Sequence, residues 1–222
     1  MHWHYSKRLP VGRLVKLGAW EDGQFAGVVI LSRGANNHIG SRYGLTSTEV
    51  CELTRVALRQ HQAPVSQIVA QCLRYLKSTS PGLRLVVSFA DPGQGHHGGI
   101  YQAGNWIYSG VAEPSRFFRI NGKLVHERSL SVSLGFTKRP GQHRTLPRNI
   151  DWIRANLDPR AEEVMVQGKH RYLYPLDRAM RRRIMPLAKP YPAAEVSTAT
   201  RTAPGDEGQV RPLEAALDSE GI

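Results

Sequence analysis

The chain has 222 residues, of which 41% are hydrophobic, and this length allows one domain with a sizeable core plus appendages. Lys and Arg number 30 against 18 Asp and Glu, and the formal net charge of +12 favours a polyanionic partner such as nucleic acid. No apolar run approaches the roughly 20 residues of a membrane span, and no secretory signal pattern is present. We therefore expect a soluble, cytoplasmic protein in which Cys51 and Cys72 are free thiols.

The first predicted element is a β-hairpin. Residues 13–20 and 24–32 are rich in apolar side chains and flank Asp22-Gly23, a pair that favours a tight hairpin turn. Residues 32–48 then form a predicted loop, whose Asn and His side chains suit a base edge and whose Arg side chains suit phosphate. An ordinary surface loop of turn-forming residues is the alternative. The candidate DNA contacts in this loop are Arg33, Asn36, Asn37, His38 and Arg42.

Residues 49–111 carry the strongest pattern. A strand is predicted at 50–58, an amphipathic helix at 65–77 and a buried strand at 83–90. A helical crossover makes two such strands parallel neighbours, and ligands of open α/β sheets collect at the carboxyl ends of the strands. These ends carry polar segments, so we expect the chemistry there. The two segments are Arg59-Gln60-His61-Gln62 and Asp91-Pro92-Gly93-Gln94-Gly95-His96-His97.

The elements that follow are shorter. We predict a strand at 107–111, a second hairpin around Asn121-Gly122, a helix at 149–157 and a strand at 162–166. The segment between the second hairpin and the helix is polar and basic, and it is predicted only as loop.

The segment 169–189 carries seven bases against one acid. Within it, Leu176, Met180 and Ile184 share one side of a predicted helix, so the arginines of that helix face elsewhere. Such a helix is either a solvated surface or, beside Tyr172, a track for DNA phosphates, and we expect the second. The candidate DNA contacts here are Lys169, Arg171, Tyr172, Arg178, Arg181 and Arg182.

These patterns place one domain at 1–192, with a core at about 11–126 and a basic extension at 127–192. Residues 193–222 hold six acids and two bases, and we expect them to form a disordered acidic tail. The positive charge is therefore concentrated on the part that folds.

Several stretches resemble known proteins. Residues 100–106 (IYQAGNW) look like the "Leu-Tyr-x-x-x-Gly-Phe" helix end of the GNAT acyltransferase superfamily, with Asn105 in place of the helix-ending glycine. A more specific resemblance, over about residues 2–192, is to the Mom-like phage proteins. It rests on the segments 4–8 (HYSKR), 32–40 (SRGANNHIG), 52–55 (ELTR), 96–104 (HHGGIYQAG) and 169–177 (KHRYLYPLD).

The resemblance implies a fold and a function. The fold is α/β and GNAT-like, with a mixed β-sheet flanked by helices in a single domain. The function is conversion of adenine in double-stranded phage DNA to N6-carbamoylmethyladenine, which shields the DNA from host restriction endonucleases. The target adenine must then be flipped out, because its N6 amine is paired inside the duplex. Acetyl-CoA or a related acyl donor is the implied cofactor, and iron has been associated with the Mom-like family.

The resemblance also points to catalytic residues. Tyr101 stands where GNAT enzymes often have a tyrosine that protonates the departing thiolate, a task that suits a phenol. Asp91 directly follows the buried strand and is a candidate base or contact for the adenine amine, although Asp-Pro-Gly is also ordinary turn chemistry. His96 and His97 are candidate iron ligands, on a spacing that lacks the regularity of common metal sites.

Arg55, Arg59 and Ser66 are the candidate cofactor contacts. Ser66 lies in the first turn of the 65–77 helix, where exposed amide groups suit a pyrophosphate. The preceding segment 59–65 departs from the superfamily, however, because it contains no glycine. Two other functions therefore stay open: a conventional acetyl-CoA-dependent N-acetyltransferase for a protein or small amine, and a non-catalytic, basic DNA-binding protein.

Overall fold

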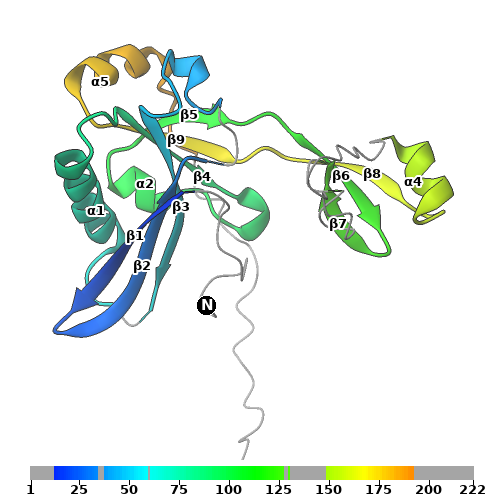
Figure 1. Cartoon of the computed structure of the whole chain (residues 1–222), viewed down its shortest axis with the longest axis horizontal. Helices are drawn as coiled ribbons and strands as arrows, with labels where there is room; N and C mark the ends of the chain where they lie inside the picture. The colour runs from blue at the N-terminus through cyan, green and yellow to red at the C-terminus, as the bar shows by residue number, and fades with distance from the viewer. Residues whose placement is uncertain (1–12, 35–37, 60, 128–129, 131–148, 193–222) are drawn as a thin grey trace, which may run out of the picture.

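A computed structural model describes residues 13–34, 38–59, 61–127, 130 and 149–192. They form an α/β domain built on a six-stranded mixed sheet with helices on both faces (Figure 1). The strands of this main sheet are β1 (Leu14–Glu21), β2 (Gln24–Ser32), β3 (Val50–Leu58), β4 (Leu85–Ala90), β5 (Ile107–Val111) and β9 (His170–Pro175). Their spatial order is β1-β2-β3-β4-β9-β5.

The predicted hairpin is confirmed as the β1–β2 pair. Asp22 and Gly23 take φ values of 48° and 76°, and such left-handed turn residues match the right-handed twist of the two strands. The same turn recurs at Asn121 and Gly122, with φ values of 47° and 74°. It joins β6 (Ser115–Ile120) to β7 (Lys123–His126), as the sequence predicted.

The predicted parallel crossover is also confirmed. Strand β3 leads through α1 (Val65–Thr79) into β4, and the two strands pair in parallel from Val50–Leu85 to Leu53–Ser88. Beyond this register β3 continues to Leu58 along β2, whereas β4 continues to Ala90 along β9. The parallel neighbours therefore diverge at their carboxyl ends, and this divergence positions the candidate site.

Alternation along the central strands builds a core on each face of the sheet. Val86 packs with Leu73 and Leu76 of α1, while Leu85 and Val87 pack on the opposite face. Each large apolar side chain buried in this way stabilises the fold by about 1.5–3 kcal/mol. On the α1 face lies α2 (Gly99–Ala103); on the other lie α5 (Arg178–Ile184) and the 3₁₀ helix η1 (Ser41–Tyr43). Two further short 3₁₀ helices are η2 (Pro92–Gln94) and η4 (Met185–Leu187).

The position of β9 corrects the predicted domain layout. The sequence placed 127–192 in an extension, but β9 is inserted between β4 and β5 in the main sheet. Tyr172 and Leu173 of this strand are fully buried, one in the core of each face. The core therefore includes residues on both sides of position 126.

A second, three-stranded sheet lies outside the main one. It has the order β7-β6-β8, with β8 at Glu162–Val166, and the helix α4 (Ile150–Asn156) packs its Ile153 against Phe118 and Ile120. Figure 1 shows this unit projecting from the main sheet on the two chain segments that follow β5 and precede β9. The helix and the strand predicted here are confirmed.

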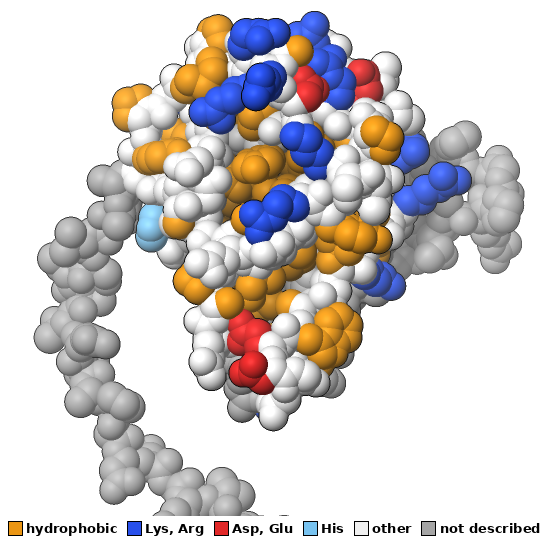
Figure 2. Space-filling model, turned by 90° about the vertical axis from the view of Figure 1, so that its left-hand side faces the viewer, with side chains coloured by type: hydrophobic (Ala, Val, Ile, Leu, Met, Phe, Trp, Pro, Cys, Tyr) orange, Lys and Arg blue, Asp and Glu red, His pale blue; other side chains and the backbone are white. Residues whose placement is uncertain are grey.

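Charge is unevenly distributed over the part of the chain that the structure describes. Figure 2 shows Lys and Arg side chains gathered at the upper end of the molecule, where Figure 1 places α5, with acidic side chains beside them there and others at the lower end. No helix of the described residues is long and apolar enough to cross a membrane. The predicted acidic tail and most of the basic loop before α4 lie outside the described residues.

Candidate functional site

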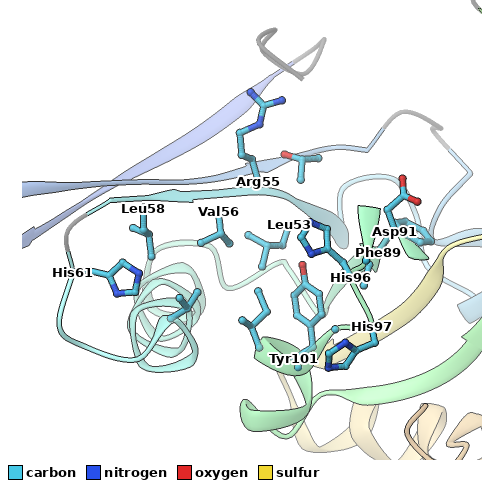
Figure 3. Close-up of a pocket in the computed structure, with 17 residues that line it drawn as sticks. Leu53, Arg55, Val56, Leu58, His61, Phe89, Asp91, His96, His97 and Tyr101 are labelled. Carbon is cyan, nitrogen blue, oxygen red and sulfur yellow. The ribbon is translucent and has the colours of Figure 1, made fainter. Parts of the chain in front are cut away.

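A cleft of about 380 Å³ opens where β3 and β4 diverge. Leu53, Val56 and Leu58 point into it from β3, and the segment that follows β4 forms the opposite wall (Figure 3). Its volume lies in the range of roughly 300–1,000 Å³ that is typical of small-molecule sites. Five predicted site residues line this cleft: Arg55, Asp91, His96, His97 and Tyr101.

Tyr101 lies where the two strands part. It sits on α2, a helix of five residues that is followed by Asn105 with the left-handed φ of 57° expected there. Ser88 Oγ is 2.8 Å from both the Tyr101 hydroxyl and Leu53 O. Ser88 Oγ carries one hydrogen, so it donates either to Leu53 O, which can only accept, or to the Tyr101 hydroxyl. A phenol that is 8% exposed, polarised by a buried hydroxyl and facing a cleft, is suited to proton transfer.

Tyr172 was predicted to contact DNA, and this prediction is wrong. Its side chain is fully buried, and its ring centroid lies 5.0 Å from that of Tyr101. The hydroxyl donates to His97 O at 2.6 Å, and burial raises the pKa of Tyr172, which keeps this donor protonated. Gly98 has φ 89° and packs directly on the same ring. Tyr172 therefore holds the segment after β4 in place.

Asp91 ends β4 and is engaged on both carboxylate oxygens. Oδ1 accepts from the Gly93 amide at 3.0 Å, which caps η2, and Oδ2 lies 2.8 Å from Lys169 Nζ. Lys169, predicted as a DNA contact, thus meets a predicted catalytic residue. Figure 3 shows the Asp91 carboxylate at the far end of the cleft, pointing away from Tyr101.

The proposed metal ligands do not assemble into a metal site. His96 is exposed and His97 half-buried, and both border the cleft. Across the described ranges no three His, Cys, Asp or Glu side chains stand close enough to hold a metal ion. With the ammonium of Lys169 already at Asp91, these residues do not fit the iron that the family resemblance implied.

The predicted cofactor contacts are scattered. Arg55 borders the cleft, but its guanidinium points to the other side of β3 (Figure 3). Arg59 is exposed, and Ser66 is half-buried in the first turn of α1, outside the cleft lining. The amides of Gln62 and Ala63, just before α1, both donate to the Glu21 carboxylate. These two amides are therefore engaged within the protein, and the acyl donor stays a prediction.

Sequence reasoning missed two residues of the site. His61 lines the cleft beside Leu58, and Ser88 contacts Tyr101 at its base. A signal for His61 was present, because it lies in the polar segment after β3 that was expected to carry chemistry. Ser88 had no such signal, since a serine in a buried strand is indistinguishable in sequence from a packing residue.

The predicted DNA contacts on α5 and η1 form a separate surface. Arg183 Nη1 donates to Tyr43 O at 3.1 Å, which joins α5 to η1, and Arg42 is exposed there. The exposed arginines Arg178, Arg181 and Arg182 face away from the buried Met180 and Ile184, as predicted.

This surface covers the amino ends of β3 and β4, opposite the cleft. Arg33 and His38 are exposed, whereas Arg171 stacks on Phe89 at 5.9 Å, and residues 36 and 37 lie outside the described part of the chain.

Comparison with known proteins identifies relatives of this chain. One relative is "Methylcarbamoylase mom" of Escherichia phage Mu, which is 28% identical over 198 residues; the alignment covers 85% of this chain and 76% of the relative. The Mom protein family matches residues 1–193. Because this match extends over most of the 222 residues, the chain belongs to the Mom protein family.

Proposed function

We propose that this protein is an enzyme that modifies adenine in phage DNA by transferring a carbamoylmethyl-type group to N6. The product, N6-carbamoylmethyladenine, would shield the DNA from host restriction endonucleases. Family membership and the name of the phage Mu relative support modification with a methylcarbamoyl group. The observation that carries the proposal is the cleft at the divergence of β3 and β4, with the Tyr101 hydroxyl at its base.

The cleft suits a flipped base. In duplex DNA the N6 amine is hydrogen-bonded to the partner strand, so the enzyme must extrude the adenine before it can react. A pocket of about 380 Å³, with apolar walls from Leu53, Val56 and Ile100, gives a planar base a surface on which to pack. Tyr101 then donates a proton to the group that leaves the transferred carbon, which lowers the barrier to its departure.

Mass spectrometry of nucleosides tests the proposal. Plasmid DNA from cells that express the protein should contain N6-carbamoylmethyladenine, and DNA from cells with an empty vector should not. Tyr101→Phe removes one hydroxyl and keeps the ring between Trp106 and Tyr172. This variant should form the modified base about 10²-fold more slowly or worse, while its affinity for DNA stays close to wild type.

Other outcomes distinguish the alternatives. Unmodified adenine together with tight acetyl-CoA binding would favour an N-acetyltransferase. Unmodified adenine with steeply salt-dependent DNA binding would favour a non-catalytic DNA-binding protein. Equal loss of modification and DNA affinity in Tyr101→Phe would remove Tyr101 from the catalytic role.

A further inference from the structure

A hydrogen bond fixes the orientation of the His61 ring in the cleft and determines which of its nitrogens carries the hydrogen. Its Nδ1 lies 2.9 Å from Ala63 O, and a carbonyl oxygen can only accept a hydrogen bond. Nδ1 therefore carries the hydrogen, and in the neutral ring Nε2 keeps a lone pair. The ring lines the same cleft as Tyr101 and stands on the α1 side, beside Leu58 (Figure 3).

The loop that carries His61 is fixed by a residue far away in the sequence. Glu21, at the end of β1, accepts from the Gln62 amide at 2.7 Å and from the Ala63 amide at 2.9 Å. These two amides lower the pKa of the Glu21 carboxyl, which keeps it charged. The result is a chain from the Glu21 carboxylate through the backbone of Ala63 to the imidazole, and it fixes the position of the ring.

The other candidate base in the cleft is already engaged. Both oxygens of Asp91 have partners, Lys169 and the Gly93 amide, and the carboxylate points away from Tyr101. His61 is held in place by its own hydrogen bond, and that bond leaves Nε2 as the acceptor. A general base needs this combination of a fixed orientation and a lone pair.

We propose that His61 is the catalytic base that takes the proton from adenine N6, and that Glu21 is its positioning residue. This inference rests on the proposed function. The N6 lone pair forms the new N–C bond to the methylene of a carbamoylmethyl donor that carries a leaving group. The bond from that carbon to the leaving group breaks with its electron pair, and Tyr101 protonates the departing group. The N6 proton passes to His61 Nε2, and exchange with water restores both side chains.

The test uses permeabilised cells that express the full chain and carry a plasmid, so that the natural donor is present. His61→Asn can still donate to Ala63 O but has no basic nitrogen, and it should form the modified base about 10²-fold more slowly or worse. The rate of His61→Gly should fall by the same factor. Added imidazole supplies the missing base, so it should raise the rate of His61→Gly by at least about a tenth of that factor, which is about tenfold for a 10²-fold loss. The control is His126→Asn on β7, outside the cleft, which should modify DNA at the wild-type rate.

Glu21→Gln tests the positioning role. The side-chain nitrogen of glutamine cannot accept, so one of the two amide contacts is lost, and the rate should fall by less than in His61→Asn. In a His61→Gly background the same change should cause little further loss, because the two residues act as one unit. The inference about His61 would be overturned by a near-wild-type rate in His61→Asn or by a His61→Gly defect that imidazole leaves unchanged. Neither result would overturn the proposed function. Absence of the modified base with the wild-type chain would overturn the proposed function as well.

Discussion

At the scale of single residues, the segment after β4 depends on the contact between Gly98 and the Tyr172 ring. A Cβ atom on Gly98 would come within 2.3 Å of that ring, and the φ of 89° is a strained conformation for any other residue. Tyr172 cannot move aside, because it is fully buried and its hydroxyl is bound to His97 O. The histidine segment is thus fixed by packing as well as by hydrogen bonding.

Gly98→Ala should therefore destabilise the protein by about 2–4 kcal/mol, measured as the free energy of unfolding in urea. Gly95→Ala is the matched control, since Gly95 has φ 68° on the same segment but nothing within 4 Å of the added Cβ atom. The free energy of unfolding of this control should fall only by the strain of the left-handed conformation, about 1 kcal/mol. Equal losses in the two variants would show that the Tyr172 ring gives way.

The sequence anticipated single residues unevenly, and the reasons are physical. Asp91, His96 and His97 were located because a polar segment after a buried strand must lie at the open edge of the sheet, whereas Tyr101 was located from the resemblance of residues 100–106 to the GNAT helix end. Tyr172 was misplaced, since a tyrosine between basic residues has the same composition in a DNA-binding track as in a central strand. His61 was left aside because its role depends on Glu21, 40 positions earlier in the chain.

At the scale of elements, Asp177 connects α5 to the sheet. Its carboxylate accepts from the Met180 amide at 2.6 Å, which caps the helix, and from Arg84 Nε at 2.9 Å. The hydrogen bond from Arg84 is the main reason why the pKa of Asp177 lies below its ordinary value of 3.8, and the Met180 amide adds to it. A carboxyl whose pKa is lowered in the folded state stabilises the protein fully above its unfolded pKa. This stabilisation is lost as the pH falls through the folded value.

Asp177→Ala should lower the free energy of unfolding at pH 7 by about 1–2 kcal/mol, because it removes the cap and the ion pair with a half-exposed partner. Asp177→Asn keeps a cap acceptor and loses only the charge, so it should lose less. Urea titrations at pH 7 and pH 3 check the sign: the gap between wild type and Asp177→Asn should narrow at pH 3. A gap that stays constant would mean that the charge does not stabilise α5.

Local sequence patterns predict most strands of the main sheet, but they do not predict the insertion of β9 that completes it. The β1–β2 hairpin and the β3–α1–β4 crossover were predictable because their signals, a turn pair and two kinds of periodicity, lie within a few dozen residues. The insertion of β9 between β4 and β5 is a pairing between segments about 60 to 90 positions apart. The basic residues Lys169 and Arg171 beside them hid the buried Tyr172 and Leu173, so the segment was predicted to be an extension.

At the scale of the whole molecule, the fold separates two kinds of surface. The cleft opens at the carboxyl ends of β3 and β4, while α5 and η1 present arginines at the amino ends of the same strands. The sequence predicted both surfaces but placed them around one site. Because topology puts them at opposite ends, we expect the proposed contact with DNA phosphates over α5 to be separable from the proposed reaction of the base in the cleft.

This separation predicts how α5 variants behave. Replacing Arg178, Arg181 and Arg182 with Gln should weaken DNA binding, because fewer phosphates are then neutralised. The logarithm of the DNA-binding constant falls linearly with the logarithm of the salt concentration. The slope of this line should become shallower by about 0.9 for each phosphate that no longer has a cationic partner. The rate of adenine modification at saturating DNA should stay near wild type, because the cleft is unchanged.

The matched control removes three charges from the second sheet and its neighbourhood, through Gln at the exposed Arg119, Lys123 and Arg160. Both triple variants lower the net charge of +12 by the same amount, so a purely global attraction would weaken DNA binding equally in the two. A larger loss of affinity for the α5 variant, with a shallower salt slope, would locate the phosphate-binding residues on that helix. A fall in its rate at saturating DNA would instead mean that the duplex reaches from α5 to the cleft as one continuous binding surface.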